Sequence, residues 1–225
     1  SFGFSATAMH WLSASPGPLN SHTHVQASGD AEALQRFTAQ AMADWNFQLD
    51  LRSRELQVGG LLLTVNLSRD EEGRYLGHNG GRTRNVHDQL HQIWREMTDE
   101  GKVSEELYRS ATVNNFYKSP EEFMAPLKDT ESPAYRNGLR LVDQRTVYVE
   151  CPYRRRWNED RDTAAFAAGL MATIRSWSRH SFASVAGDAI ADEVYRRLEQ
   201  RIAAAPEEWS LDYVEHHQIM EKVEA

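Results

Sequence analysis

The sequence predicts an α/β domain built around a parallel sheet. Residues Ser1–Ser5 form a short apolar segment, Asp30–Leu56 has the apolar spacing of a long helix, and Leu61–Asn66 is a continuous apolar run after Gly59-Gly60. A strand, a helix and a second strand in this order make a βαβ unit, whose two strands run parallel. Because the second strand is apolar without alternation, we expect it to be covered on both faces.

The first helix has clear signals at both ends. Asp30 is a plausible N-cap and Glu32 places an acid in the first turn, while Gly59-Gly60 ends the helix. The apolar positions that share one helical face are Leu34, Phe37, Ala41, Trp45, Leu49 and Leu56.

Further elements follow the second strand. Residues 70–84 are polar and rich in glycine, which predicts an exposed loop, and residues 85–100 predict a helix that ends at Gly101. Ser119-Pro120-Glu121-Glu122 has the N-cap, first-turn proline and acids that start a helix.

The last third of the chain predicts two strands and two helices. Leu139–Cys151 and Leu211–Met220 favour strands, and residues 163–205 favour two helices that divide within residues 181–187. The additional helices precede the last strand. Because open α/β sheets bind ligands outside the carboxyl ends of their strands, we expect these helices to roof such a site.

Composition restricts the partners. The chain has 225 residues, a formal charge of -8 and a pI of about 5.6, so one domain is expected and nucleic acid is an unfavourable partner. The basic run 153–157 is followed by acids, which predicts a solvated, self-paired loop. The sequence shows no apolar run of the ~20 residues that span a bilayer, and the single Cys151 fits a reducing cytoplasm.

The chain opens inside a predicted strand and begins with Ser1 rather than Met. We therefore expect it to be part of a longer protein. The glycine pair Gly59-Gly60 precedes a strand, and the glycines of 77–81 lie in a loop with no strand before them. Neither is a nucleotide-binding turn, so cofactor-binding residues are expected upstream of Ser1.

Signatures of common catalytic sites are absent from the sequence. It contains no GxSxG, HExxH, CxxC or P-loop motif. Cys151 is expected to be a small buried residue at a strand end. His87 and His91 have a spacing that can chelate a metal, but no third ligand is signalled, so no metal site is predicted.

A tryptophan, Trp11, lies just beyond the carboxyl end of the first predicted strand. Its indole N–H is a hydrogen-bond donor only. It could hold a carboxylate oxygen in a ligand pocket, or it could be packed in the core beneath the roof helices.

Five blocks of the sequence, in order, resemble the SABATH family of carboxyl and purine N-methyltransferases. The blocks are Ser5–Pro16 with its HWLS, Phe47–Thr64 (FQLDLRSRELQVGGLLLT), Met97–Leu107 (MTDEGKVSEEL), Phe116–Phe123 (FYKSPEEF) and Arg175–Ile190 with its AGDAI end.

The resemblance implies the C-terminal part of a Rossmann-like class I methyltransferase sheet with an inserted helical cap. Residues 1–225 would form one domain, with core strands and helix in 1–69, a mostly helical cap in 70–135, and further core strands and cap helices in 136–225. The implied reaction moves the methyl group of S-adenosylmethionine to the carboxylate of a small organic acid and gives a methyl ester. A carboxylate is a nucleophile at pH 7, so orientation suffices and no catalytic base is required.

The resemblance also implies a set of pocket residues. Trp11 corresponds to the family tryptophan that holds the substrate carboxylate, and His10 to its neighbour in the pocket. Packing in the cap is the alternative for each of these residues. Weaker matches complete the set, which comprises Trp11, His10, Val86, His87, Phe116, Asn66 or Leu67, Ile174 and Trp209.

Departures from the family pattern modify the expectation. His10 and His87 replace less polar residues, which favours a hydroxylated or polar acid. His22 and Arg109 stand where some members carry magnesium ligands, so no metal is carried over. The family's glycine-rich turn, ribose-binding acid and second carboxylate-binding residue would precede Ser1, so we expect this segment alone to be inactive.

Two further hypotheses stay open. The chain could be a naturally short, non-catalytic relative that serves as a binding or dimerisation partner, and a homodimer is compatible with the resemblance. An unrelated α/β hydrolase is disfavoured because the nucleophile elbow is missing.

Overall fold

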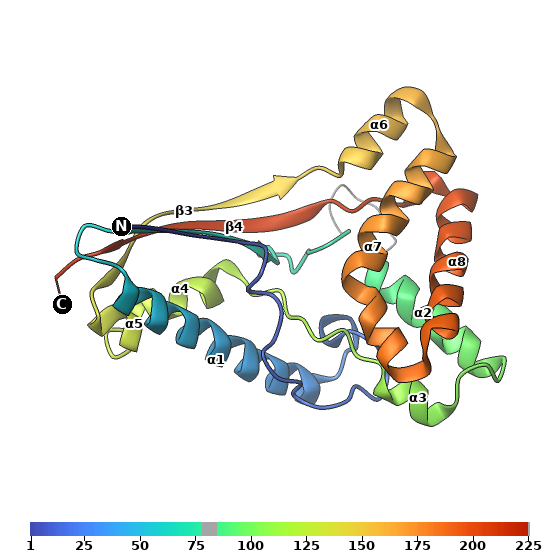
Figure 1. Ribbon diagram of the computed structural model, residues 1–225, viewed down its shortest axis with the longest axis horizontal. Coiled ribbons are helices and arrows are strands. Elements are labelled where there is room, and N and C mark those ends of the chain that lie inside the picture. Colours follow the sequence, from blue (N-terminus) through green and yellow to red (C-terminus); the bar gives the residue numbers. More distant parts are fainter. Residues whose placement is uncertain (78–84, 225) are drawn as a thin grey trace.

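The computed structural model describes residues 1–77 and 85–224, which form a four-stranded sheet with helices beneath it and a helical cap at one end (Figure 1). The strands are β1 (Phe2–Ala6), β2 (Leu61–Ser68), β3 (Leu139–Val149) and β4 (Tyr213–Lys222), in the order β1-β2-β4-β3. None of the helices among the described residues is both long and apolar enough to cross a bilayer.

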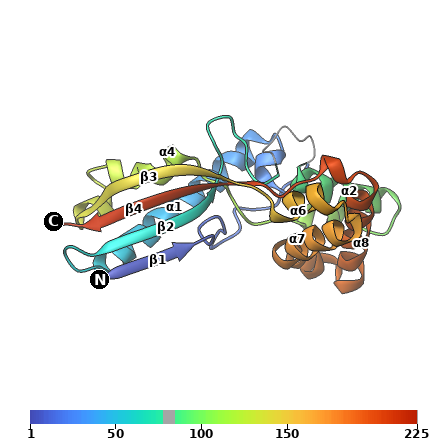
Figure 2. The same ribbon diagram turned by 90° about the horizontal axis from the view of Figure 1, so that it is seen from above.

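The sheet is mixed rather than parallel throughout. β1 and β2 pair in parallel, as predicted, but β4 is antiparallel to both of its neighbours. The chain leaves β3 at the end where β1 and β2 also finish, passes through the cap, and enters β4 from that same end (Figure 2). We call this end of the sheet the carboxyl edge.

Helix α1 (Ala31–Glu55) makes the crossover from β1 to β2. The Asp30 carboxylate accepts a hydrogen bond from the Ala33 N–H at 2.9 Å, which confirms the predicted N-cap. Trp45 is buried on the predicted face, and its indole N–H donates to the carbonyl of Phe123 at 2.9 Å. This bond joins α1 to α4 (Pro120–Lys128), whose predicted start at Ser119 has the full capping box.

Only one face of the sheet is covered by described helices. α1, α4 and α5 (Pro133–Arg136) lie together beneath it, and the opposite face carries no element among the described residues (Figures 1 and 2). Exposure along β2 consequently alternates, and Phe2 and Phe4 of β1 are 68% and 61% exposed. The expectation that β2 is covered on both faces was wrong, because an apolar run does not tell which faces have a partner.

The cap consists of α2 (Val86–Asp99), α3 (Glu105–Ser110), α6 (Pro152–Asp160), α7 (Thr163–Ala186) and α8 (Asp188–Ala204). Two single-turn 3-10 helices, Val25–Ala27 and Pro206–Glu208, complete the described helices. α7 and α8 are divided at Gly187, within the predicted interval, where φ is 84°. A separate apolar core joins these helices.

The loop after β2 is less exposed than predicted. Asp70 is buried and accepts hydrogen bonds from Arg74 and from the Tyr148 hydroxyl at 2.7 and 3.0 Å. Tyr75 and Leu76 are buried in the cap core. The charged residues of this loop pair with one another, so the loop can be buried in part. The rest of the predicted loop, 78–84, lies outside the described residues.

The basic run 153–157 is helical, and Arg154 within it is buried rather than solvated. Its guanidinium lies 4.7 Å from the ring centres of Trp157 and Phe166 and donates to the carbonyls of Pro206 and Trp209. Arg154 therefore ties α6 to the segment that leads into β4. The Arg156–Asp160 pair at 3.0 Å is the kind of solvated pair predicted.

Arg154→Met should lower the free energy of unfolding by about 2 kcal/mol, because two buried carbonyls lose charge-assisted donors while the apolar stem is kept. Urea denaturation measures the change. Arg155→Met is the matched control, since Arg155 is exposed, and should change stability by less than about 0.5 kcal/mol. Equal effects of the two substitutions would contradict the structural role of Arg154.

Several buried histidines make stability depend on pH. Burial lowers the pKa of His10 to about 4, of His24 to about 3 and of His216 to about 4. Below pH 6.5 these histidines therefore bind protons in the unfolded chain but stay unprotonated in the folded chain until the pH approaches their lowered pKa values. Stability should fall as the pH drops from about 6.5 to about 4, by up to about 1.4 kcal/mol per pH unit for each group.

Urea denaturation of the His216→Phe variant tests this dependence. His216 stacks on Phe123 with ring centres 5.6 Å apart, so a phenyl ring fits the site without titrating. The variant should lose less stability than the wild type between pH 7 and pH 5. His180→Gln, at an exposed position, should behave like the wild type; a parallel pH dependence in all three proteins would be evidence against the prediction.

Candidate active site

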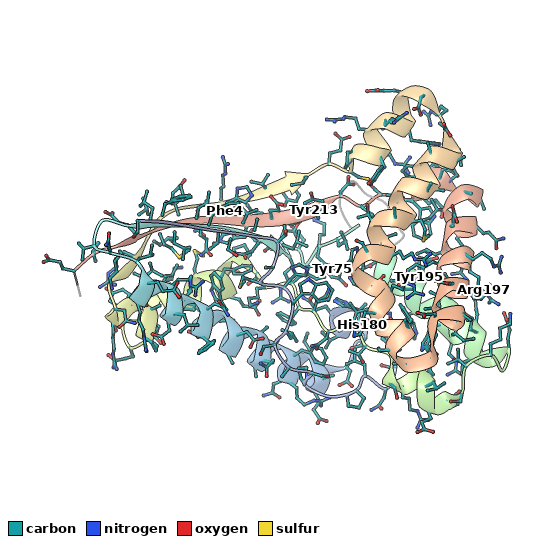
Figure 3. All side chains as sticks on the ribbon, in the orientation of Figure 1. Phe4, Tyr75, His180, Tyr195, Arg197 and Tyr213 are labelled. Atoms are coloured by element: carbon teal, nitrogen blue, oxygen red, sulfur yellow. The ribbon has the colours of Figure 1, made fainter. Side chains whose placement is uncertain are left out.

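A cavity of about 270 Å³ lies between the carboxyl edge of the sheet and the cap. Its lining is dominated by aromatic and leucine side chains and contains no Asp, Glu, Lys or Arg among the described residues. The lining residues are Thr7, His10, Trp11, Leu67, Leu76, Asn115, Tyr117, Thr173, Trp177, Leu211 and Tyr213. Figure 3 shows Tyr75 and Tyr213 in the region where the sheet meets the cap.

The loop after β1 is held in place by the segment 114–118. The N–H of Phe116 donates to the His10 carbonyl at 2.8 Å, and Trp11 and Asn115 form an isolated antiparallel bridge. At its other end the segment bridges to β2, since Ser68 and Lys118 pair in parallel. One short segment therefore fixes Trp11 relative to the end of β2.

Lys118 strengthens this arrangement from beneath. The side chain is 1% exposed, and its ammonium group donates to the Met9 carbonyl at 2.6 Å. Burial lowers the pKa of Lys118 to about 8. A buried ammonium requires an acceptor, so the Met9 carbonyl is held at this position and the next residues of the loop are directed into the cavity.

Two tryptophans that line the cavity have an indole N–H without an acceptor among the described residues. Trp11 comes from the loop after β1, and Trp177 comes from α7 on the opposite wall. Trp11 is 39% exposed, so its ring is at the opening of the cavity. An unpaired N–H in apolar surroundings favours a ligand with an acceptor oxygen.

A second layer of polar residues supports the wall. The His87 ring nitrogen Nε2 lies 3.2 Å from the Tyr117 hydroxyl, and the His87 ring is 5.5 Å from that of Trp177. The Nε2 of His24 donates to the amide oxygen of Asn115 at 2.9 Å. The side chains that face the cavity are thus oriented by buried partners.

The structure brings together some of the residues predicted for the pocket. Trp11, His10 and Leu67 line the cavity, and His87 lies directly behind the lining. The remaining predicted residues are fully buried and are not among the lining residues: Val86, Ile174 and Trp209 in the cap core, Phe116 beside α1, and Asn66 on the covered face of β2.

The cavity consequently differs from the one expected. His87 does not face it, and burial together with the Lys118 charge keeps the pKa of His10 at about 4, so that His10 is neutral near pH 7. The walls are therefore more apolar than the two histidines suggested.

Several lining residues were missed by the sequence reasoning. Tyr117 is the neighbour of the predicted Phe116, and Thr173 and Trp177 flank the predicted Ile174 on α7. Alternation in an extended segment and the i, i+4 spacing on a helix were usable signals. They define which residues share a face but not which face meets the ligand.

The residues described here do not by themselves form a site for S-adenosylmethionine. A dinucleotide-type site requires a glycine-rich turn after a strand and an acid for the ribose. β1 is followed by Thr7, Ala8 and Met9, and the acid that follows β2, Asp70, is engaged by Arg74 and Tyr148. The cavity is also below the roughly 300–1,000 Å³ of pockets for larger ligands.

Histidines near the cavity stack rather than chelate. His22 stacks on His91 and His24 on His87, with ring centres 4.1 and 3.8 Å apart. Within the described ranges, His, Cys, Asp and Glu do not form a group of three or more that could hold a metal ion. Cys151 is buried just after β3, as predicted.

Comparison with solved structures shows a shared fold. The structure of loganic acid methyltransferase with SAH aligns with a TM-score of 0.68 at 17% identity, over 99% of this chain and 61% of that chain. This chain therefore spans less than two thirds of that methyltransferase. The [4+2]-cyclase SpnF aligns over 100% of this chain and 50% of its own at 11% identity, with a TM-score of 0.34.

A putative sarcosine dimethylglycine methyltransferase from Galdieria sulphuraria aligns over 100% of this chain and 53% of its own, at 12% identity and a TM-score of 0.29. No curated protein matches the sequence. The family model described as SAM dependent carboxyl methyltransferase matches residues 1–223. Because this match spans nearly the whole chain, the chain belongs to the family of S-adenosylmethionine-dependent carboxyl methyltransferases.

Proposed function

We propose that the cavity binds a small carboxylic acid, which the protein converts to its methyl ester. The observation that carries this proposal is the indole N–H of Trp11, a donor without a described acceptor at the opening of an uncharged cavity. A carboxylate oxygen is the acceptor that satisfies it best, because hydrogen bonds to charged groups are the strong ones. S-adenosylmethionine is the methyl donor of the family.

The lining suits a reaction that requires no base. A carboxylic acid has a reference pKa near 4 and is ionised at pH 7, so its oxygen already carries the attacking electron pair. No described lining residue is an Asp, Glu or Lys, and the His10 imidazole is a weak base because burial and the Lys118 charge lower its pKa to about 4. The contribution of this chain is to orient the carboxylate and to exclude water from it.

The arrangement of the walls supports this role. The backbone at Trp11 is held by the bridge to Asn115 and by the Lys118 bond to the preceding loop, which keeps the residue on the cavity wall. Leu67, Leu76 and Leu211 surround the space with apolar surface. A carboxylate bound through one oxygen to Trp11 would keep its other oxygen free to accept the methyl group.

Methyl-ester formation from labelled S-adenosylmethionine and a panel of small acids, with the protein expressed at full length from its gene, tests the proposal. At least one acid should be esterified. If none is, while the protein is folded and binds S-adenosylhomocysteine, the proposed reaction is excluded. A folded protein that binds neither S-adenosylhomocysteine nor an acid would support the non-catalytic alternative.

Trp11→Phe should reduce kcat/KM for the acid that is esterified by about 10- to 100-fold, because an aromatic ring is kept while the donor to a charged oxygen is lost. Trp177→Phe removes the other unpaired indole N–H of the cavity and is the matched comparison. We expect a smaller loss from it. Normal turnover by folded Trp11→Phe would refute the assignment, and the reverse order of effects would transfer the role to Trp177.

A further inference from the structure

We propose that Asn115 selects acids that carry a second hydrogen-bonding oxygen, a hydroxyl or a carbonyl, and that His24 is the positioning residue that orients the Asn115 amide. This inference rests on the proposed function, because it concerns a second contact with the same acid.

The backbone places Asn115 beside Trp11. The two residues are opposite one another in an antiparallel bridge, and side chains of such a pair point to the same side. Both line the cavity, and Asn115 is 1% exposed. An acid bound to Trp11 would therefore lie within the space that Asn115 also lines.

The buried partner of Asn115 determines which end of the amide faces the ligand. His24 is fully buried, and its Nε2 is 2.9 Å from the amide oxygen of Asn115, while its Nδ1 has no partner among the described residues. If Nε2 carries the proton, the unpaired Nδ1 is only an acceptor. The other tautomer would bury an unpaired N–H, and orphaned N–H groups are rarer than under-satisfied acceptors.

With Nε2–H donating, the amide oxygen of Asn115 is committed to His24 and the NH₂ group points the other way. One N–H has a long contact of 3.5 Å with the Tyr117 hydroxyl. That hydroxyl is itself shared with His87 at 3.2 Å. The amide thus retains donor capacity on the cavity side, where the described residues offer no further acceptor for it.

Neighbouring side chains keep this donor in place. Tyr117 stacks on Tyr75 with ring centres 5.0 Å apart and on His10 at 5.9 Å, and the His24 ring is 3.8 Å from that of His87. The Thr173 hydroxyl on the opposite wall is already bonded to the Gly169 carbonyl at 3.2 Å. A buried donor in a largely apolar cavity discriminates against a ligand that leaves it unpaired.

The experiment measures the ratio of kcat/KM for an oxygen-bearing acid to kcat/KM for its parent acid. Benzoate and phenylacetate are compared with their ring-hydroxylated derivatives, and cyclohexanecarboxylate with its hydroxy and keto derivatives. For the wild type, kcat/KM should favour at least one oxygen-bearing acid over its parent by about tenfold or more. In Asn115→Leu this ratio should fall towards one. Asn115→Thr is made in parallel in case the leucine variant does not fold.

His24 is tested by rescue. His24→Phe removes the donor to the Asn115 oxygen and should lower the ratio, and His24→Gln, whose amide can donate to that oxygen, should restore part of it. A ratio unchanged in folded Asn115 variants would overturn the inference. A loss of turnover in His24→Phe that is equal for both members of each pair would show that His24 is only structural.

Calorimetric titration of the same acids separates this inference from the proposed function. If no acid is esterified by any protein, the proposed function fails, and the ratio of Kd values in wild type and Asn115→Leu still tests the selection. A Kd ratio that depends on Asn115 would support it, and one that does not would overturn it.

Discussion

The arrangement of the site depends on one short segment, residues 114–118, which joins the loop after β1 to the end of β2. Its backbone bridges to Trp11 and to Ser68, and Lys118 at its end donates to the Met9 carbonyl from a site that is 1% exposed. A buried ammonium without an acceptor would cost several kcal/mol. Because that constraint holds the loop, the backbone of Trp11 has a defined place on the cavity wall.

The proposed function depends on where the cavity lies in the fold. The cavity lies at the carboxyl edge, where open α/β sheets bind ligands, and most of its apolar lining belongs to the cap core or packs against it. Each wall contributes a tryptophan whose indole N–H has no acceptor among the described residues, and otherwise mostly apolar surface. The described lining has no Asp, Glu, Lys or Arg, and the pKa of His10 is lowered to about 4, which suits the proposed methyl transfer to a group that is already ionised.

Local signals in the sequence were sufficient to predict α1, the start of α4 at Ser119, the interval that divides α7 from α8 and the approximate strand positions. These signals were insufficient to predict which residues of each element face the cavity. Phe116 was predicted where Tyr117 lines the cavity, and Ile174 where Thr173 and Trp177 do, because the face that meets the ligand is set by tertiary contacts. Arg154 was predicted to be solvated for the same reason, since its partners, Trp209 and Phe166, are distant in sequence or on another helix.

Trp11 is proposed to hold the carboxylate of the acid, and NMR of its indole ¹H–¹⁵N resonance tests this role most directly. The resonance is assigned by its absence from the Trp11→Phe spectrum. The protein is titrated with the acid that it esterifies, in the presence of S-adenosylhomocysteine. The indole proton should move downfield until the site is saturated, because a charged acceptor deshields the donor proton. Saturable binding of the acid with no change at the Trp11 indole would contradict the account.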